Sequence, residues 1–369
     1  MRVLFTCLSQ SWGGMEMYAL TTVKQLLKHN IETELVCFPD SRLHEEAVKE
    51  NITIHTFRFK SYINLAATSK LSTLIKKNSY DVIECGGSKD LWLVVPALKL
   101  SGSNIPLFLS KQMASFIIKK DMMHRWIYNR VTKAFAISNV IMKNLEETTP
   151  LTKDKIVLLH NAIDTNKFDP AKIDRTKVRK EFSIADDELL IGMIARFSPG
   201  KGHEEFLQAV NQITERHSNV KFMIVGEASR GEENYAHKIK AFAGELNILD
   251  KIIFTGFRKD TPEILAALDI FIFPSHDEAF GIALAEALSM GKPSVCSNFA
   301  GVLDIAVDDE TSYLFEKGNG DDLASKTEKL INSKETRERF GSAARKRAIE
   351  MFDLEIFTEK LVQHFKQSR

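Results

Sequence analysis

The hydrophobic pattern of the chain alternates between two periods. Short apolar runs are separated by longer stretches in which apolar residues recur every three or four positions, as in Glu16 to His29. The short runs predict strands, and the longer stretches predict helices. The predicted strands are 2–8, 33–38, 52–57, 81–85, 105–110, 134–138 and 156–159, then 189–195, 220–225, 251–255, 269–273 and 293–297. This alternation is typical of parallel sheets covered by helices.

The two sets of strands predict two domains. Residues 160–175, which separate the sets, are rich in turn formers and charged residues. A chain of 369 residues also exceeds the usual size of a single core. Two doubly wound units therefore fit the α/β pattern better than one large sheet. In such sheets ligands bind at the carboxyl ends of the strands, so two units that face each other would form one deep cleft.

The stretch from Asp269 to Pro293 combines a buried strand, a polar loop and a helix. Glu278 lies in the loop, and Glu286 lies two helical turns further on. Free backbone N–H groups near Phe280 and Gly281, at the positive end of the helix, form a natural seat for a diphosphate. The two carboxylates fit hydroxyl groups on opposite ends of a sugar nucleotide. The alternative is that both are solvated surface residues, but Glu286 lies in an otherwise apolar helix.

Two further loops follow predicted strands. Arg196 and Lys201 bracket a Pro-Gly turn after strand 189–195, which would aim two cations at a diphosphate leaving group. The alternative is two ordinary surface cations. Gly13-Gly14 follows the first strand and lets the backbone approach a ligand closely, although a simple tight turn explains the same pair. Neither a G-x-G-x-x-G fingerprint nor a P-loop is present.

Composition places the chain among soluble globular proteins, with 44% hydrophobic and 27% charged residues. The four cysteines occur singly within apolar runs and predict buried free thiols of a reducing compartment. No secretory signal and no run of about 18 apolar residues occurs, so we expect a cytoplasmic protein that does not cross a membrane.

Charge is distributed unevenly along the chain. Residues 1–170 carry 22 Lys and Arg against 16 Asp and Glu, whereas residues 171–369 carry 28 against 33. A basic first half suits an anionic membrane surface or a phosphorylated acceptor, and ordinary surface variation is the alternative. The segment from Phe116 to Tyr128 mixes basic and large apolar residues, which fits a helix on a membrane surface or a helix that faces the core. Peripheral contact with the inner face of the membrane is thus a second option for the location.

Together these segments resemble the retaining glycosyltransferases of family 4, which have the two-domain GT-B fold. Glu278 to Glu286 looks like the E-x7-E element of that family, and Arg196 to Gly202 matches its Arg…Lys-Gly segment. Asn161 to Asp164 is similar to the Asn-Gly-Val-Asp interdomain signature, and Leu268 to Ser275 looks like the strand before the first glutamate. The resemblance covers nearly the whole chain, and the four matches occur in the family's order.

The resemblance implies a domain plan and a role for each matched residue. The expected domains are an acceptor-binding Rossmann-like domain, 1–165, a nucleotide-sugar-binding Rossmann-like domain, 166–345, and a C-terminal helix, 346–369, that crosses back to the first domain. Glu278 would hold donor-sugar hydroxyls and Glu286 the ribose, while Arg196 and Lys201 neutralise the diphosphate. The expected remaining contacts are backbone groups of Phe280, Gly281 and Ile282, Gly14 from the first domain, and Phe257 and Arg258 near the base. No metal and no other cofactor is expected.

One position departs from the family pattern. Many members carry a His after the strand that corresponds to residues 106–110, whereas this chain has Lys111 and Gln112 there. A Gln side chain hydrogen-bonds a sugar but cannot act as a base. This departure favours a front-face displacement assisted by the leaving phosphate. Gln112, Lys111 and Asn161 are accordingly predicted contacts to the acceptor or the donor sugar.

The sequence therefore predicts a retaining, metal-independent hexosyltransferase. It would move a sugar from a nucleotide sugar, with UDP favoured and GDP as the alternative, to a glycan or lipid-linked acceptor in polysaccharide or lipopolysaccharide synthesis. No nucleic-acid partner is expected. The alternatives are a GT-B-fold epimerase, for which no convincing acid–base set is present, a phosphorylase, which needs a longer chain and a pyridoxal-binding lysine, and a non-catalytic nucleotide-sugar-binding homologue.

Overall fold

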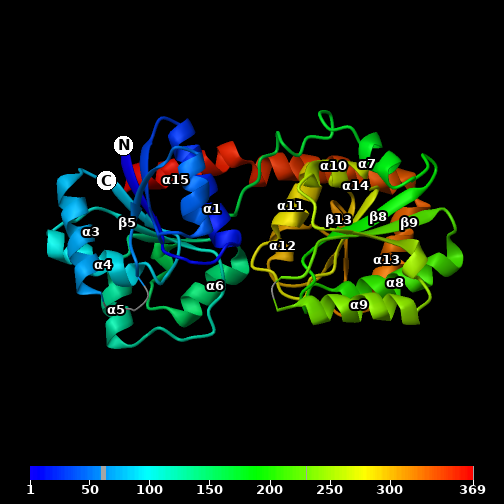
Figure 1. Cartoon of the computed structure of the whole chain (residues 1–369), viewed down its shortest axis with the longest axis horizontal. Helices are drawn as coiled ribbons and strands as arrows, with labels where there is room; N and C mark the ends of the chain where they lie inside the picture. The colour runs from blue at the N-terminus through cyan, green and yellow to red at the C-terminus, as the bar shows by residue number, and fades with distance from the viewer. Residues whose placement is uncertain (60–63, 230, 369) are drawn as a thin grey trace. The chain divides into compact units, whose positions relative to one another are not determined.

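The computed structural model describes residues 1–59, 64–229 and 231–368 (Figure 1). The chain divides into two compact units, which we call unit 1, Met1–Asn161 with Leu354–Arg369, and unit 2, Ala162–Asp353. Each unit contains one parallel sheet with alternating helices. The expected α/β architecture with two Rossmann-like sheets is therefore confirmed.

Unit 1 is built on a parallel sheet with the order β3-β2-β1-β4-β5-β6-β7 across the described residues. Val3 of β1 pairs with Thr33 of β2 on one side and Val82 of β4 on the other, so β1 is an interior strand. The strands are β1 Arg2–Cys7, β2 Glu32–Cys37, β3 Thr53–Thr56, β4 Val82–Cys85, β5 Leu107–Lys111, β6 Lys133–Ala136 and β7 Ile156–Leu158. The helices are α1 Gly14–Lys28, α2 Arg42–Lys49, α3 Leu65–Lys77, α4 Leu91–Ser101, α5 Met122–Asn129, α6 Asn139–Thr148, the 3-10 turn η1 Lys153–Lys155 and α15 Leu354–Gln367.

The C-terminal helix α15 completes the core of unit 1. Phe365 packs on Phe108 of β5 with ring centroids 4.9 Å apart, and Phe108 stacks on Phe135 of β6 at 5.5 Å. Phe357 meets Tyr18 of α1 edge-on at 5.9 Å, so α15 lies beside α1. Lys28 and His29 at the end of α1 also contact Glu355. The last 14 helical residues of the chain thus belong to the same core as the first strand.

Unit 2 has the strand order β10-β9-β8-β11-β12-β13 across the described residues, with β8 and β11 as central neighbours. In Figure 1, α8 and α9 lie on one side of this sheet and α7, α10 and α14 on the other. The strands are β8 Leu189–Ile194, β9 Val220–Val225, β10 Ile252–Gly256, β11 Ile270–Phe273, β12 Ser294–Ser297 and β13 Ser312–Phe315. The helices are α7 Thr176–Glu181, α8 His203–Arg216, α9 Glu233–Glu245, η2 Leu249–Lys251, α10 Thr261–Ala267, α11 Ile282–Ser289, α12 Val302–Ile305, α13 Gly320–Asn332 and α14 Lys334–Phe352.

The sequence pattern missed β13. This strand has four residues, follows a charged turn at 308–310, and pairs with β12 at the edge of the sheet. Four residues are too few to show the alternation of apolar and polar positions that predicts a strand. The strand therefore depends on pairing with β12. The C-terminal helices α14 and α15 are separate, because the chain is extended at Asp353, where φ is −67° and ψ is 139°. Among the described residues, no helix is long and apolar enough to cross a bilayer.

A buried carboxylate links α1 to the sheet of unit 1. Glu84 of β4 is inaccessible to solvent and accepts hydrogen bonds from Ser110 Oγ at 2.6 Å and Tyr18 Oη at 3.2 Å. Its second oxygen, Oε2, is buried without a partner in the described part of the chain. Burial raises the pKa of Glu84 to about 7, although the two hydrogen bonds oppose that shift.

A glycine joins the two central loops of unit 2. Gly202 has φ +78°, and a Cβ there would lie 2.2 Å from the carbonyl oxygen of Pro274. The loop after β8 therefore packs directly on the end of β11. Gly200, two residues earlier, has φ +81° but open space around its Cβ position. Both glycines therefore have a left-handed backbone, but only Gly202 also has a close contact at its Cβ position. Comparing substitutions at the two positions measures the cost of that contact.

We predict that Glu84→Gln flattens the pH dependence of unfolding. Between about pH 4.5 and 7 folded Glu84 retains a proton that the unfolded chain releases, so the unfolding free energy falls as pH rises. This single group contributes a slope of about 1.4 kcal/mol per pH unit, which Gln removes. Urea unfolding across that range measures the slope. Asp90, whose pKa is also about 7, leaves a residual slope, and exposed Glu359→Gln is the control. Equal slopes for wild type and Glu84→Gln would refute the assignment.

We also predict that Gly202→Ala destabilises unit 2 more than Gly200→Ala. Both substitutions force a side chain into the left-handed region at a cost of about 1–2 kcal/mol. Only the methyl group added by Gly202→Ala must in addition displace the backbone at Pro274. Thermal unfolding of the two variants should therefore show a clearly larger fall in Tm for Gly202→Ala. Similar Tm values would mean that the two loops are not held in contact in solution.

Candidate functional site

The loops after β8 and β11 meet at the carboxyl ends of their strands. Lys201 Nζ lies 2.6 Å from Glu278 Oε1, and Ser275 Oγ donates to the same oxygen at 2.9 Å. The backbone N–H of His276 donates to the Gly200 carbonyl at 2.8 Å, which ties the loops together. Glu278 Oε1 thus has two donors, whereas its Oε2 has no hydrogen-bond partner in the described part of the chain. That oxygen remains able to accept a hydrogen bond from a ligand hydroxyl.

Lys201 retains donor capacity beyond this pair. An ammonium group has three N–H donors, and Glu278 is its hydrogen-bond partner within residues 1–59, 64–229 and 231–368. Both side chains are largely but not fully covered, with 24% and 19% exposed. Two N–H donors of Lys201 are therefore available to an anion at this edge of the sheet.

The start of α11 is an uncapped helix N-terminus in the same loop region. Gly281 is the N-cap residue with φ +114°, and no side chain caps the first turn. Phe280 is buried and meets Phe352 edge-on at 5.5 Å, which anchors the chain before the helix. Ile282 begins the helix and is partly exposed. The N–H groups of a helix start favour an anionic ligand, as predicted for a diphosphate.

Glu286 lies about one turn after Ile282 in α11. It is half-buried, and burial raises the pKa of its carboxyl to about 7, with Lys167 opposing the shift. The described residues supply no hydrogen bond to this carboxylate. A desolvated acceptor without a partner is costly in a helix that is otherwise apolar. Such a group is suited to accept hydroxyl hydrogen bonds, which would favour its ionised form.

Arg196 and Lys201 engage different partners. Arg196 is exposed and donates from Nη1 to Ser229 Oγ at 2.7 Å, on the loop after β9. Nearby, Ser198 Oγ donates to Glu232 Oε1 at 2.5 Å, and this bond, together with the charge of Arg196, lowers the pKa of Glu232. Arg196 and Lys201 thus have different partners in the structure, and their joint action on one diphosphate stays a prediction.

The residues predicted near the base differ in their environment. Phe257 is 60% exposed beyond the end of β10. Arg258 is held by two carboxylates, through Glu181 at 2.5 Å and Asp260 at 2.7 Å, and these bonds raise its pKa. Its charge is therefore already balanced within unit 2. The Gly226 N–H donates to the Gly256 carbonyl at 3.0 Å, so these two backbone groups bind each other.

In unit 1 a cavity of about 440 Å³ opens at the carboxyl ends of β1, β4 and β5. It lies beside the start of α1, where Gly13 is an N-cap without a side chain and a Cβ at Gly14 would meet open space. Its lining combines polar and apolar groups and comprises Leu8, Ser9, Gln10, Ser11, Met15, Gly86, Gly87, Ser88, Lys89, Asp90, Ser110, Lys111, Gln112 and Met113.

Gln112 and Asn161 form a buried amide pair. Asn161 Nδ2 donates to Gln112 Oε1 at 3.0 Å, and both residues are at most 7% exposed. The other amide atoms, Gln112 Nε2 and Asn161 Oδ1, are buried without partners among the described residues. One free donor and one free acceptor therefore lie close together beside the cavity. Hydroxyl groups of a sugar satisfy such a pair.

Lys111 is a desolvated cation at the same edge. It is the last residue of β5 and lines the cavity. Burial lowers the pKa of its ammonium to about 8, and Lys119 adds repulsion. Its charged form thus lacks a compensating carboxylate among the described residues, which favours an anionic neighbour.

Sequence reasoning missed the residues that support these groups. Asp90 is buried, accepts from Thr6 Oγ1 at 3.0 Å and from the Leu8 N–H at 3.3 Å, and so fixes the chain that leads to Gly14. Burial raises the pKa of Asp90 to about 7. Gly86-Gly87 after strand 81–85 was the available signal for this loop. Ser275 had no signal of its own. Among the described residues, no cluster of three His, Cys, Asp or Glu side chains is arranged to hold a metal ion.

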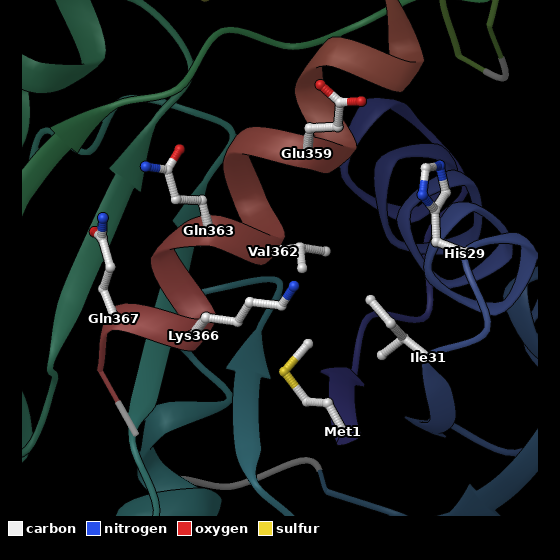
Figure 2. A pocket seen from close by; sticks show the side chains of 8 residues that line it. All are labelled: Met1, His29, Ile31, Glu359, Val362, Gln363, Lys366 and Gln367. Atoms are coloured by element: carbon white, nitrogen blue, oxygen red, sulfur yellow. The ribbon is translucent and has the colours of Figure 1, made fainter.

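A second cavity of unit 1, of about 670 Å³, lies at the opposite end of the sheet (Figure 2). Its lining comes from Met1 before β1, His29 and Ile31 before β2, and α15. Figure 2 shows Lys366 and Val362 of α15 directed toward Met1 and Ile31. Ligands of doubly wound sheets bind at the carboxyl ends of the strands. This cavity at the amino ends is therefore not assigned to the site.

Two family sequence models match the chain. The family described as Glycosyltransferase Family 4 matches residues 12–167, and the family described as Glycosyl transferases group 1 matches residues 174–347. The chain is 28% identical over 239 residues to the capsular polysaccharide biosynthesis glycosyltransferase CapM of Staphylococcus aureus. That match covers 62% of this chain and 60% of the relative, so the chain spans less than two thirds of its length.

Solved structures with low sequence identity share the fold over the full chain. A glycosyltransferase from Rickettsia africae is 22% identical with a TM-score of 0.91, covering 100% of this chain and 98% of the other. The Anabaena protein HepE, solved with UDP-glucose, is 21% identical with a TM-score of 0.81, covering 100% of both chains. With two matching family models and this shared fold, the chain belongs to glycosyltransferase family 4 and has the GT-B fold.

Proposed function

We propose that this glycosyltransferase transfers a sugar with retention from a nucleotide sugar, UDP-linked by preference and GDP-linked as the alternative. The acceptor is a hydroxyl of a glycan or lipid-linked precursor of cell-surface polysaccharide or lipopolysaccharide. The observation that carries the proposal is the contact of Lys201 and Ser275 with one oxygen of Glu278, in the loop that leads to the uncapped start of α11.

The donor roles follow from what each group still lacks. The free Oε2 of Glu278 would accept a donor-sugar hydroxyl, while Lys201 and the first N–H groups of α11 bind the diphosphate. Glu286, desolvated and without a hydrogen bond from the described residues, would accept the ribose hydroxyls. Arg196 would exchange its bond to Ser229 for a phosphate oxygen. Positive charge is then available as the leaving diphosphate becomes more negative, and a divalent ion is not required for that task.

Retention is proposed from the chemistry available near Gln112. An amide cannot take a proton, so the side chains of Gln112 and Asn161 orient hydroxyls through their free Nε2 and Oδ1 atoms. The leaving phosphate would then assist the incoming hydroxyl on the same face of the sugar. The choice of donor and acceptor class is supported separately by the names of similar proteins, since HepE was solved with UDP-glucose and CapM is named for capsular polysaccharide biosynthesis.

We expect a panel of nucleotides and nucleotide sugars to reveal the donor. The protein is heated in EDTA with UDP, GDP, ADP or their common sugar conjugates, and Tm is recorded. A ligand present at a hundredfold its Kd adds about 2.7 kcal/mol to the unfolding free energy. Glu286→Ala should abolish the shift, whereas Asp277→Ala, an exposed carboxylate of the same loop, should keep it. A parallel series replaces EDTA with Mg²⁺. No shift in either series would contradict the donor site, and a shift only in the Mg²⁺ series would contradict metal independence.

We expect Lys201→Ala and Arg196→Ala to slow donor turnover by roughly 10²–10³-fold, because each removes positive charge from the leaving group. Release of nucleoside diphosphate from the donor found above, with a lipid extract as acceptor source, measures the rate. Lys238→Ala is the control, since Lys238 is exposed on α9. Unchanged turnover in both site variants would show that Lys201 and Arg196 do not stabilise the leaving diphosphate. Donor binding without turnover in wild type would instead indicate a non-catalytic homologue.

A further inference from the structure

Unit 1 carries a dense group of exposed apolar side chains between β5 and α5. The exposed fraction is 93% for Phe116, 68% for Ile117, 69% for Ile118 and 86% for Met122. Met113 and Met123 are also more than half exposed. We call residues 113–125 the apolar–basic surface, because Lys119, Lys120 and Arg125 lie among these side chains. The predicted membrane-surface or core-facing helix is here a loop followed by a short helix, in which only Ile127 and Tyr128 are buried.

The backbone of this loop is anchored, although its side chains are exposed. Ser115 exchanges two hydrogen bonds with the side chain of Asn144 in α6, at 2.8 and 2.9 Å. The Lys119 N–H donates to the Thr148 carbonyl at 2.6 Å. Phe116, Ile117 and Ile118 therefore lie between two fixed points beside α6 and project outward. An anchored loop that presents three large apolar residues to solvent is characteristic of a binding surface.

Charge on this surface is mainly positive. Residues 113–125 contain three cations, Lys119, Lys120 and Arg125, and one carboxylate, Asp121. Asp121 caps α5 by accepting from the N–H groups of Met123 and His124 at 3.0 and 3.1 Å. Lysine is depleted from the cores of protein–protein interfaces. Exposed Lys and Arg next to Phe, Ile and Met side chains are instead typical of segments that bind the interface of an anionic bilayer.

We propose that the apolar–basic surface docks on an anionic phospholipid bilayer. Phe116, Ile117, Ile118 and Met122 insert at the boundary of headgroups and acyl chains, and the neighbouring cations contact lipid phosphates. Met113 belongs both to this surface and to the cavity lined by Lys111 and Gln112. Docking therefore brings the mouth of that cavity to the headgroup layer. The consequence that a lipid-linked acceptor phosphate meets Lys111 rests on the proposed function, whereas docking itself does not.

Flotation of the full chain with lipid vesicles tests the proposal. We expect binding to vesicles of phosphatidylcholine mixed with phosphatidylglycerol, and weak binding to phosphatidylcholine alone. The double variant Phe116→Ser/Ile117→Ser should reduce the partition coefficient by at least about tenfold, because it removes the inserted side chains. Lys120→Gln/Arg125→Gln should reduce it by about 25-fold, since each cation near an anionic surface contributes roughly a fivefold factor.

The matched control is Leu65→Ser/Val48→Ser, which removes two exposed apolar residues of unit 1 outside the surface. This control should bind vesicles as wild type does. All variants should keep the wild-type Tm, because the replaced side chains are exposed. Equal vesicle binding of wild type and Phe116→Ser/Ile117→Ser, or no binding to anionic vesicles, would overturn the proposal. Dimerisation of wild type that the same double variant abolishes, without vesicle binding, would overturn it in favour of a second copy of the chain.

The nucleotide-induced shift in Tm separates this proposal from the proposed function. The surface lies in unit 1 and the proposed donor groups lie in unit 2, so the surface variants should retain the shift. Vesicle binding without any nucleotide response would support docking and contradict the transferase. A nucleotide response without vesicle binding would contradict docking and leave the donor site supported.

Discussion

The close packing of the loops after β8 and β11 is the constraint on which the donor side of the site depends. The two strands are neighbours in the middle of the sheet, and Gly202 brings one loop against Pro274 at the end of the other strand. This contact places Lys201 beside Glu278, where an ion pair forms between largely covered side chains. Removing one partner would leave the other charge poorly solvated, which is more costly than losing an exposed pair. The glycine and the ion pair therefore support each other.

Unit 1 relies on buried polar groups in a comparable way. Asp90 holds the chain before Gly14, and Glu84 joins α1 to the sheet through Tyr18 and Ser110. Both carboxyls have a pKa of about 7 because burial outweighs their hydrogen bonds. The ligand-side loop thus rests on groups whose protonation changes near neutral pH. These two groups therefore contribute stability that is gained at lower pH, opposite to the usual behaviour of surface-paired carboxylates.

The sequence pattern was sufficient for the two sheets and for the position of the main loops. Apolar runs alone located the twelve strands that the described residues form besides β13, whose four residues depend on pairing with β12. The matched motifs placed Glu278 and Lys201 in loops after strands, and the observed strand order brings these two loops together. Ser275 and Asp90 could not be found, because a single hydroxyl or carboxyl has no period. Their roles come from tertiary contacts between residues far apart in the chain.

The side-chain partners of each cation indicate whether it is available to bind an anion, which the sequence alone does not show. Arg196 and Arg258 are both cations after strands, but Arg258 is neutralised by Glu181 and Asp260, while Arg196 has a hydroxyl partner. A cation held by two carboxylates is a poor phosphate ligand, since binding must first break charge-assisted bonds. The excess positive charge of residues 1–170 likewise matters only where the cations are not paired with carboxylates. The part that lies on the apolar–basic surface is next to exposed apolar groups, and Asp121 is already occupied as a helix cap. Only cations that lack such internal compensation remain to attract an external anion. Among the described residues, no carboxylate forms an ion pair with Lys111, Lys120 or Arg125.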